Sequence, residues 1–125
     1  MKKGFTLLEL LVSTIILSVG IMGIGALFPA ALRSSLLTRQ NSQAIEYCQQ
    51  EIEFLRTLNY EDTALEAGTH GPDSLDDKFE RNYEIFPDYP AVDMKKIVVT
   101  VSWKQRGGGG GLDHEQSITT YISKN

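Results

Sequence analysis

The sequence predicts an α+β fold in which one long N-terminal helix packs against a small antiparallel β-sheet. An uncharged apolar run from Leu10 to Leu32 predicts the first half of that helix. Apolar residues at three- and four-residue steps predict an amphipathic second half. Alternating apolar and polar residues after position 79 predict the strands. A helix with one apolar face above a sheet gives two layers around one core.

The apolar run is long enough to cross a membrane. Its 23 residues extend about 34 Å as a helix at ~1.5 Å per residue, against about 30 Å for a hydrocarbon core. Glu9 lies just inside the apolar segment. An acidic residue costs roughly 2.5–3.5 kcal/mol at mid-helix and less near an end. We therefore expect a partner that offsets the cost of this carboxylate.

A secretory signal peptide is the first alternative. Such a signal has an apolar core of about 7–15 residues and then a small-residue cleavage site. The apolar run here is longer, and no such site follows it. The small residue before a plausible cut is Gly4, which precedes the run, so cleavage there leaves the apolar helix on the mature protein.

The first residues of the chain carry a family resemblance. Residues 3–12 read Lys-Gly-Phe-Thr-Leu-Leu-Glu-Leu-Leu-Val, which resembles the processing and methylation motif of type IV pilins and pseudopilins. The resemblance implies the pilin fold, cleavage between Gly4 and Phe5 by a membrane peptidase, and N-methylation of Phe5. It also implies that Glu9, the fifth mature residue, serves subunit assembly. A generic membrane anchor with a chance glutamate is the alternative.

Elementary electrostatics agrees with these roles. Cleavage would give Phe5 a free ammonium at the end of a membrane helix, and neither that ammonium nor Glu9 is stable alone in low dielectric. Within one helix the two residues are four apart and could pair. In a filament, Glu9 could instead face the Phe5 ammonium of a neighbour and set the axial register of two apolar helices.

The helix is expected to run from about Phe5 to Leu58, some 80 Å at ~1.5 Å per residue. Pro29 lacks the N–H for the carbonyl of Gly25, so a kink or loosened turn is expected there. The alternative is that Pro29 and the nearby glycines are ordinary membrane-helix residues. The predicted buried stripe of the second half is Ile45, Cys48, Ile52, Leu55 and Leu58, flanked by Ala44, Tyr47 and Phe54.

The rest of the chain is expected to form a three-stranded antiparallel sheet. Residues 59–78 are rich in Gly, Pro and Asp and are expected to form a loop. Strands are predicted at 79–85, 97–103 and 117–122, with a turn between Pro87 and Pro90. The run from Gly107 to Gly111 is predicted to form a hairpin tip and lacks the features of a phosphate loop.

Composition narrows the class of protein. The chain has 125 residues, 12 Lys and Arg, and 16 Asp and Glu. Losing Lys2 and Lys3 leaves ten cations against 16 anions, near −6, which disfavours nucleic acid as a partner. Cys48 is the one cysteine, so no intrachain disulfide can form, unlike in many pilins, and it is expected in the core.

Three regions follow from these observations: a cytoplasmic leader at 1–4, a transmembrane half-helix at 5–32 and a periplasmic or extracellular headpiece at 33–125. Lys2 and Lys3 place the N-terminus in the cytoplasm by the positive-inside rule. The family resemblance implies a bacterial inner-membrane location, followed by a pilus or pseudopilus.

Catalytic and metal sites are not predicted. No Ser/His/Asp or Cys/His set is visible, which disfavours a membrane-anchored enzyme or sensor, and no cofactor is expected. The acidic loop residues Asp73, Asp76 and Asp77 do not match EF-hand spacing. His70 and His114 have no ligand partner at metal-site spacing and are expected to face solvent.

Two weaker features resemble the minor pilins of the PilV type: residues 44–56 at the helix end, and the closing pattern of residues 99–103, a glycine loop, and residues 117–122. This resemblance implies a minor type IV pilin that is incorporated into a pilus or primes its assembly. Its implied partners are other pilin subunits, the prepilin peptidase and methyltransferase, inner-membrane lipid and the assembly platform. A minor pseudopilin of a type II secretion system is the alternative, and an adhesin or nucleic-acid-uptake pilin is a third class.

Overall fold

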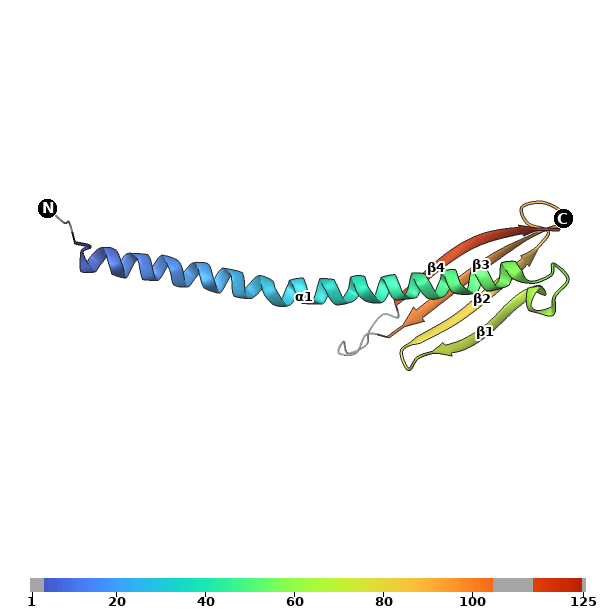
Figure 1. Cartoon of the computed structure of the whole chain (residues 1–125), viewed down its shortest axis with the longest axis horizontal. Coiled ribbons are helices and arrows are strands. Elements are labelled where there is room, and N and C mark those ends of the chain that lie inside the picture. Colours follow the sequence, from blue (N-terminus) through green and yellow to red (C-terminus); the bar gives the residue numbers. More distant parts are fainter. Residues whose placement is uncertain (1–3, 105–113, 125) are drawn as a thin grey trace. The chain divides into compact units, whose positions relative to one another are not determined.

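The computed structural model describes residues 4–104 and 114–124 (Figure 1). The chain divides into two compact units, Met1–Arg39 and Gln40–Asn125. Helix α1 (Leu7–Thr57) runs through the first unit and into the second. It begins two residues after the expected start at Phe5 and ends next to the expected Leu58, so the single long helix is confirmed. The structure assigns helix on both sides of Pro29 without a break.

The second unit contains a four-stranded antiparallel sheet in the order β1-β2-β3-β4 (Figure 1). The strands are β1 (Gly68–Leu75), β2 (Phe79–Pro87), β3 (Met94–Trp103) and β4 (His114–Ser123). Strands β2, β3 and β4 contain the three predicted strands, and the predicted turn lies between Pro87 and Met94. The predicted glycine tip at 107–111 lies outside the described residues.

The prediction of three strands and a loop at 59–78 is wrong. The short 3-10 helix η1 (Thr63–Leu65) and the whole of β1 lie in that segment. Strand β1 pairs with β2, but its register shifts between His70 and Asp73. Gly71 sits at this irregularity with φ of +103°, and a Cβ there would lie 2.9 Å from the backbone oxygen of Arg81. This strand therefore depends on glycine where the sequence pattern indicated a loop.

The core of the second unit lies between α1 and one face of the sheet. Its buried apolar members are Ala44, Cys48, Ile52, Leu55, Leu65, Phe79, Ile85, Ile97, Val99, Val101 and Trp103. The predicted helix stripe is confirmed at Cys48, Ile52 and Leu55. It is wrong at Ile45, which is 38% exposed, whereas Ala44 is fully buried. The buried face is thus rotated toward Ala44, which lies four residues before Cys48.

A largely buried ion pair connects α1 to β2. Glu51 on α1 is 7% exposed, and its carboxylate lies 2.7 Å from the Arg81 guanidinium on β2. A carboxylate can be buried here because a matched cation meets it, and removing one member of such a pair would leave an uncompensated charge. The pair therefore ties the flank of α1 to the second strand.

An aromatic cluster closes one end of the core. Trp103 is 3% exposed, and its ring centroid lies 5.7 Å from that of Phe79, which in turn lies 5.5 Å from Tyr47 on α1. Tyr47 also donates a 2.8 Å hydrogen bond to the Asp76 carboxylate, which raises the pKa of Tyr47. Large aromatic rings in contact bury extensive apolar surface, so Trp103 is a main contributor to headpiece stability.

We expect a fragment beginning at Arg33 to be soluble, since it lacks the apolar run and retains the second unit. Trp103→Ala should lower its free energy of unfolding by about 3–5 kcal/mol, because the change empties a large core volume. Chemical denaturation measures this directly. Lys104→Ala, at the exposed neighbouring position, is the control, and a loss below about 1 kcal/mol for Trp103→Ala would contradict a core role.

A second expectation concerns the irregularity in β1. Gly71→Ala should destabilise the fragment by roughly 1–3 kcal/mol or more, because it adds a strained positive φ and a backbone clash. Gly68→Ala is the matched control, since Gly68 also has a positive φ, +124°, but has nothing within 4 Å of an added Cβ. Equal losses for the two variants in chemical denaturation would show that the contact with Arg81 has no effect.

Candidate functional site: the N-terminal motif

The beginning of α1 is fixed by Thr6. Its Oγ1 accepts a 3.2 Å hydrogen bond from the backbone N–H of Glu9, and its carbonyl accepts one from Leu10. This is the geometry of a helix N-cap, with Glu9 at the third helical position. Thr6 and Glu9 also have the Ser/Thr-x-x-Glu spacing of a capping box, so the sequence itself contains a signal for this helix start. Thr6 is therefore a positioning residue that the sequence analysis missed.

The cap separates Phe5 from the helix. Phe5 lies before the N-cap and is exposed, while Glu9 lies within the first turn of α1. Phe5 and Glu9 were expected to lie four residues apart on one helix. In the chain with its leader attached, Phe5 is not part of the helix that contains Glu9. In this chain the nitrogen of Phe5 is still part of a peptide bond to Gly4, so the free ammonium does not yet exist.

The first unit exposes apolar side chains on all sides of α1. The exposed large ones are Phe5, Leu7, Leu8, Leu10, Leu11, Val12, Ile15, Ile16, Leu17, Val19, Ile21, Met22, Ile24, Leu27, Phe28, Leu32 and Leu36. Helix α1 has the length and composition to cross a membrane, with a mean hydropathy of 2.3 in its most apolar window. A helix that is apolar all round needs an apolar environment, which a bilayer supplies.

Hydroxyl groups in this segment are satisfied by the helix itself. Ser13 donates to the carbonyl of Glu9 at 2.7 Å, Thr14 to that of Leu10 at 2.5 Å, and Ser18 to that of Ile15 at 2.8 Å. A hydroxyl without a partner is costly in hydrocarbon. Because of these bonds, the hydroxyls of Ser13, Thr14 and Ser18 have hydrogen-bond partners although they lie in the apolar segment.

Residues 1–25 match the family described as "Prokaryotic N-terminal methylation motif". The chain carries the N-terminal motif of the type IV pilin and pseudopilin family. Searches of curated proteins and of solved structures gave no match. The long helix packed on a four-stranded antiparallel sheet is a pilin-like α+β fold.

The match covers the first 25 of the chain's 125 residues, and it is a match to a motif of a known family of subunits. Pilins and pseudopilins are structural subunits and not enzymes. They are processed at the methylation motif by the prepilin peptidase and assemble with other pilins.

Three headpiece residues that carry potential metal-ligand side chains contact other groups. Asp76 accepts the hydrogen bond from Tyr47. His70 stacks on Tyr83 with centroids 4.7 Å apart, and its Nε2 lies 2.9 Å from the carbonyl of Glu66. His114 stacks on Trp103 at 5.6 Å. Both histidines are half-buried, so the prediction that they face solvent is wrong.

Cys48 is a core residue, as predicted. It is fully buried, and its thiol lies 3.8 Å from the carbonyl oxygen of Val99 and 3.6 Å from that of Gln116. Burial raises the pKa of the Cys48 thiol, which disfavours the reactive thiolate. The side chain thus fills space beneath β3 and β4.

Proposed function

We propose that the protein is a minor type IV pilin of the PilV type, incorporated into a pilus or priming its assembly. One observation carries the proposal: three features occur together at the start of α1. Thr6 caps the first turn, Glu9 is the third helical residue, and an uncharged apolar segment follows. The family match over residues 1–25 supports it. The N-terminus lies in the cytoplasm and the headpiece in the periplasm in this proposal.

Processing at the motif follows from the position of Gly4. Both Gly4 and Phe5 lie outside α1 and are exposed, so a peptidase can reach the bond between them without unwinding the helix. Cleavage there exposes the Phe5 amine, which is then N-methylated. The apolar segment and the second unit are unchanged by the loss of the leader.

Assembly depends on the charge of Glu9 in this proposal. The incoming subunit brings its Glu9 carboxylate to the Phe5 ammonium of a neighbour, since two opposite charges in low dielectric stabilise each other and neither is stable alone. The pairing fixes the axial position of one apolar helix against another. Glu9 contributes little to its own headpiece, because the two belong to different compact units.

We expect the mature chain to begin at N-methylated Phe5. Mass spectrometry of the N-terminus in cells with an active prepilin peptidase checks this, and an intact Met1 start would contradict it. Gly4→Leu should block the cut while leaving membrane insertion intact. Lys3→Arg, which keeps the leader charge, is the control and should be processed like the parent.

Glu9→Val should preserve or improve membrane insertion, because it removes a charge from the apolar segment. The amount of this subunit in sheared filaments should fall by about tenfold or more, since the loss of one charged pair in low dielectric costs more than about 1.4 kcal/mol, which is tenfold in an equilibrium. Glu9→Asp, which retains the charge, is the control. Equal amounts in the Glu9→Val and parent filaments would rule out an essential pairing role and favour a position at the filament tip.

A further inference from the structure

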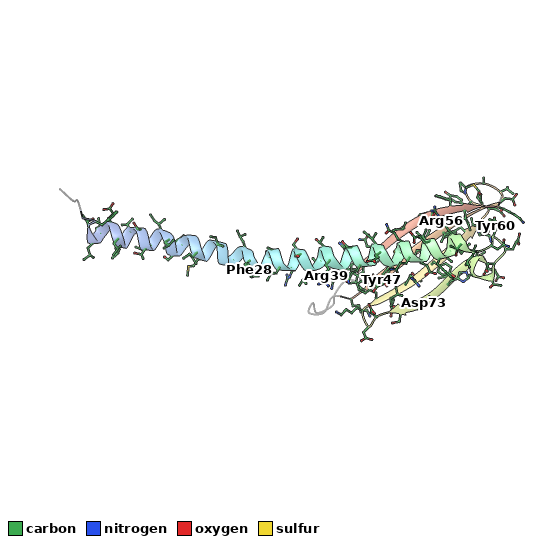
Figure 2. All side chains as sticks on the ribbon, viewed as in Figure 1. Phe28, Arg39, Tyr47, Arg56, Tyr60 and Asp73 are labelled. Atoms are coloured by element: carbon green, nitrogen blue, oxygen red, sulfur yellow. The ribbon has the colours of Figure 1, made fainter. Side chains whose placement is uncertain are left out.

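A cation ends the apolar segment of α1. Arg33 directly follows the uncharged run from Leu10 to Leu32, and its side chain is exposed. It lies on α1 between Phe28 and Arg39, which are both labelled in Figure 2. The apolar segment therefore has a charged residue at each boundary, Glu9 before it and Arg33 after it.

Arg33 has no counter-ion on its own helix. An acidic side chain three or four residues away could pair with it, but the residues at those positions are Pro29, Ala30, Leu36 and Leu37. Among the residues that the structure describes, none forms an ion pair with Arg33. The guanidinium is therefore available to an anion from outside the chain.

The spacing of the two boundary charges matches the thickness of a bilayer. Arg33 comes 24 residues after Glu9, which is about 36 Å along a helix at ~1.5 Å per residue. A hydrocarbon core is about 30 Å thick, so an upright helix can hold both charges roughly 3 Å outside it. A shift of one helical turn, about 5.4 Å, in either direction would move one of the two charges into hydrocarbon. Arg33 thus lies at the level of the lipid headgroups when Glu9 lies at the opposite interface.

We propose that Arg33 binds the phosphate of a lipid headgroup in the leaflet next to the headpiece. The planar guanidinium presents a fork of N–H donors that matches two phosphate oxygens, and the bonds are strengthened by the opposite charges. Ser34 and Ser35 are exposed and follow directly, so they add hydroxyl donors at the same level. The inference rests on the membrane-spanning stage of the proposed function, but cleavage before Phe5 and the pairing of Glu9 have no part in it.

The position of Arg33 selects a lipid phosphate over a carboxylate from a second copy. A parallel copy in the same bilayer brings its own Arg33 to this level, and no acidic residue occurs between Leu10 and Ile45. Like charges at one level repel each other, so a second copy does not supply the counter-ion. Lipid phosphates surround the helix at this level, and basic residues next to a membrane segment are attracted to anionic headgroups.

The test uses the full chain with carbon-13 at the guanidinium carbon of its arginines, reconstituted into vesicles of phosphatidylethanolamine and phosphatidylglycerol. The buffer contains no phosphate, so the lipid is the source of phosphorus-31. Rotational-echo double-resonance NMR measures the coupling between the two nuclei. The signal of one of the chain's five arginines should be dephased, and Arg33→Gln should abolish this dephasing. Arg39→Gln, six residues further along α1, is the matched control and should retain it.

Two further measurements make the outcome decisive. Alkaline carbonate extraction of the same vesicles reports whether the chain is inserted, and circular dichroism should show that Arg33→Gln retains the parent fold. An inserted parent chain without dephasing overturns this inference and leaves the proposed function intact. Dephasing that persists in Arg33→Gln also overturns it, because another arginine then holds the phosphate. Extraction of the parent chain by carbonate would contradict the membrane-spanning helix, and with it both the proposed function and this inference.

Discussion

The headpiece depends on the packing of the second half of α1 against the inner face of β3. Ile97, Val99 and Val101 are fully buried on that face, and Cys48 and Leu55 meet them from the helix. With one cysteine, the chain has no intrachain disulfide to hold these layers together. Burying a side chain such as Leu55 contributes about 1.5–3 kcal/mol, so the small core must supply the stability that a disulfide supplies in many pilins.

Polar contacts then fix the elements that this core does not cover. The Glu51–Arg81 pair joins α1 to β2, and the hydroxyl of Tyr83 donates to the carbonyl of Ala64 in η1 at 3.1 Å. Burial raises the pKa of Tyr83, which keeps its hydroxyl a donor. Lys95 donates at 2.7 Å to the carbonyl of Tyr60, which lies in the segment between α1 and η1. These bonds connect the segment that follows the helix to the sheet at several points.

The sequence predicted the elements whose burial follows a simple period. The helix and the three strands β2, β3 and β4 have apolar repeats of about 3.6 or 2 residues, and all were found near their expected positions. Strand β1 could not be found in this way, because its pattern is mostly exposed and it contains Gly71 and Pro72. Its place is set by pairing with β2, a tertiary interaction that local pattern does not report.

Local sequence pattern also fails to predict the burial of some single residues. Ile45 fits a helical apolar repeat, yet Ala44 is the residue buried, because Ala44, Cys48 and Ile52 follow one another at four-residue steps on the face that packs against the sheet. Glu51 is an acidic residue on the buried side of the helix, and its burial depends on Arg81, which is 30 residues later in the chain. The N-terminal motif was recognisable because its residues are consecutive, and the same residues contain the Thr-x-x-Glu spacing that predicts the cap observed at Thr6.

The observed cap also bears on why Glu9 is tolerated at the start of an apolar segment. A carboxylate in the first turn is stabilised by the partial positive charge at the helix N-terminus, by about 0.3–1 kcal/mol at an exposed site. The insertion cost of an acidic residue is roughly 2.5–3.5 kcal/mol at mid-helix and falls toward the end. The helix terminus therefore offsets part of the cost when the carboxylate lies near the interface, where the remainder is small. It does not offset the cost once Glu9 is enclosed among apolar helices, away from water. In the assembled filament, Glu9 therefore needs a full positive charge in addition to the partial charge of the helix terminus. In the proposed sequence of events, cleavage before Phe5 supplies that charge by creating the Phe5 ammonium.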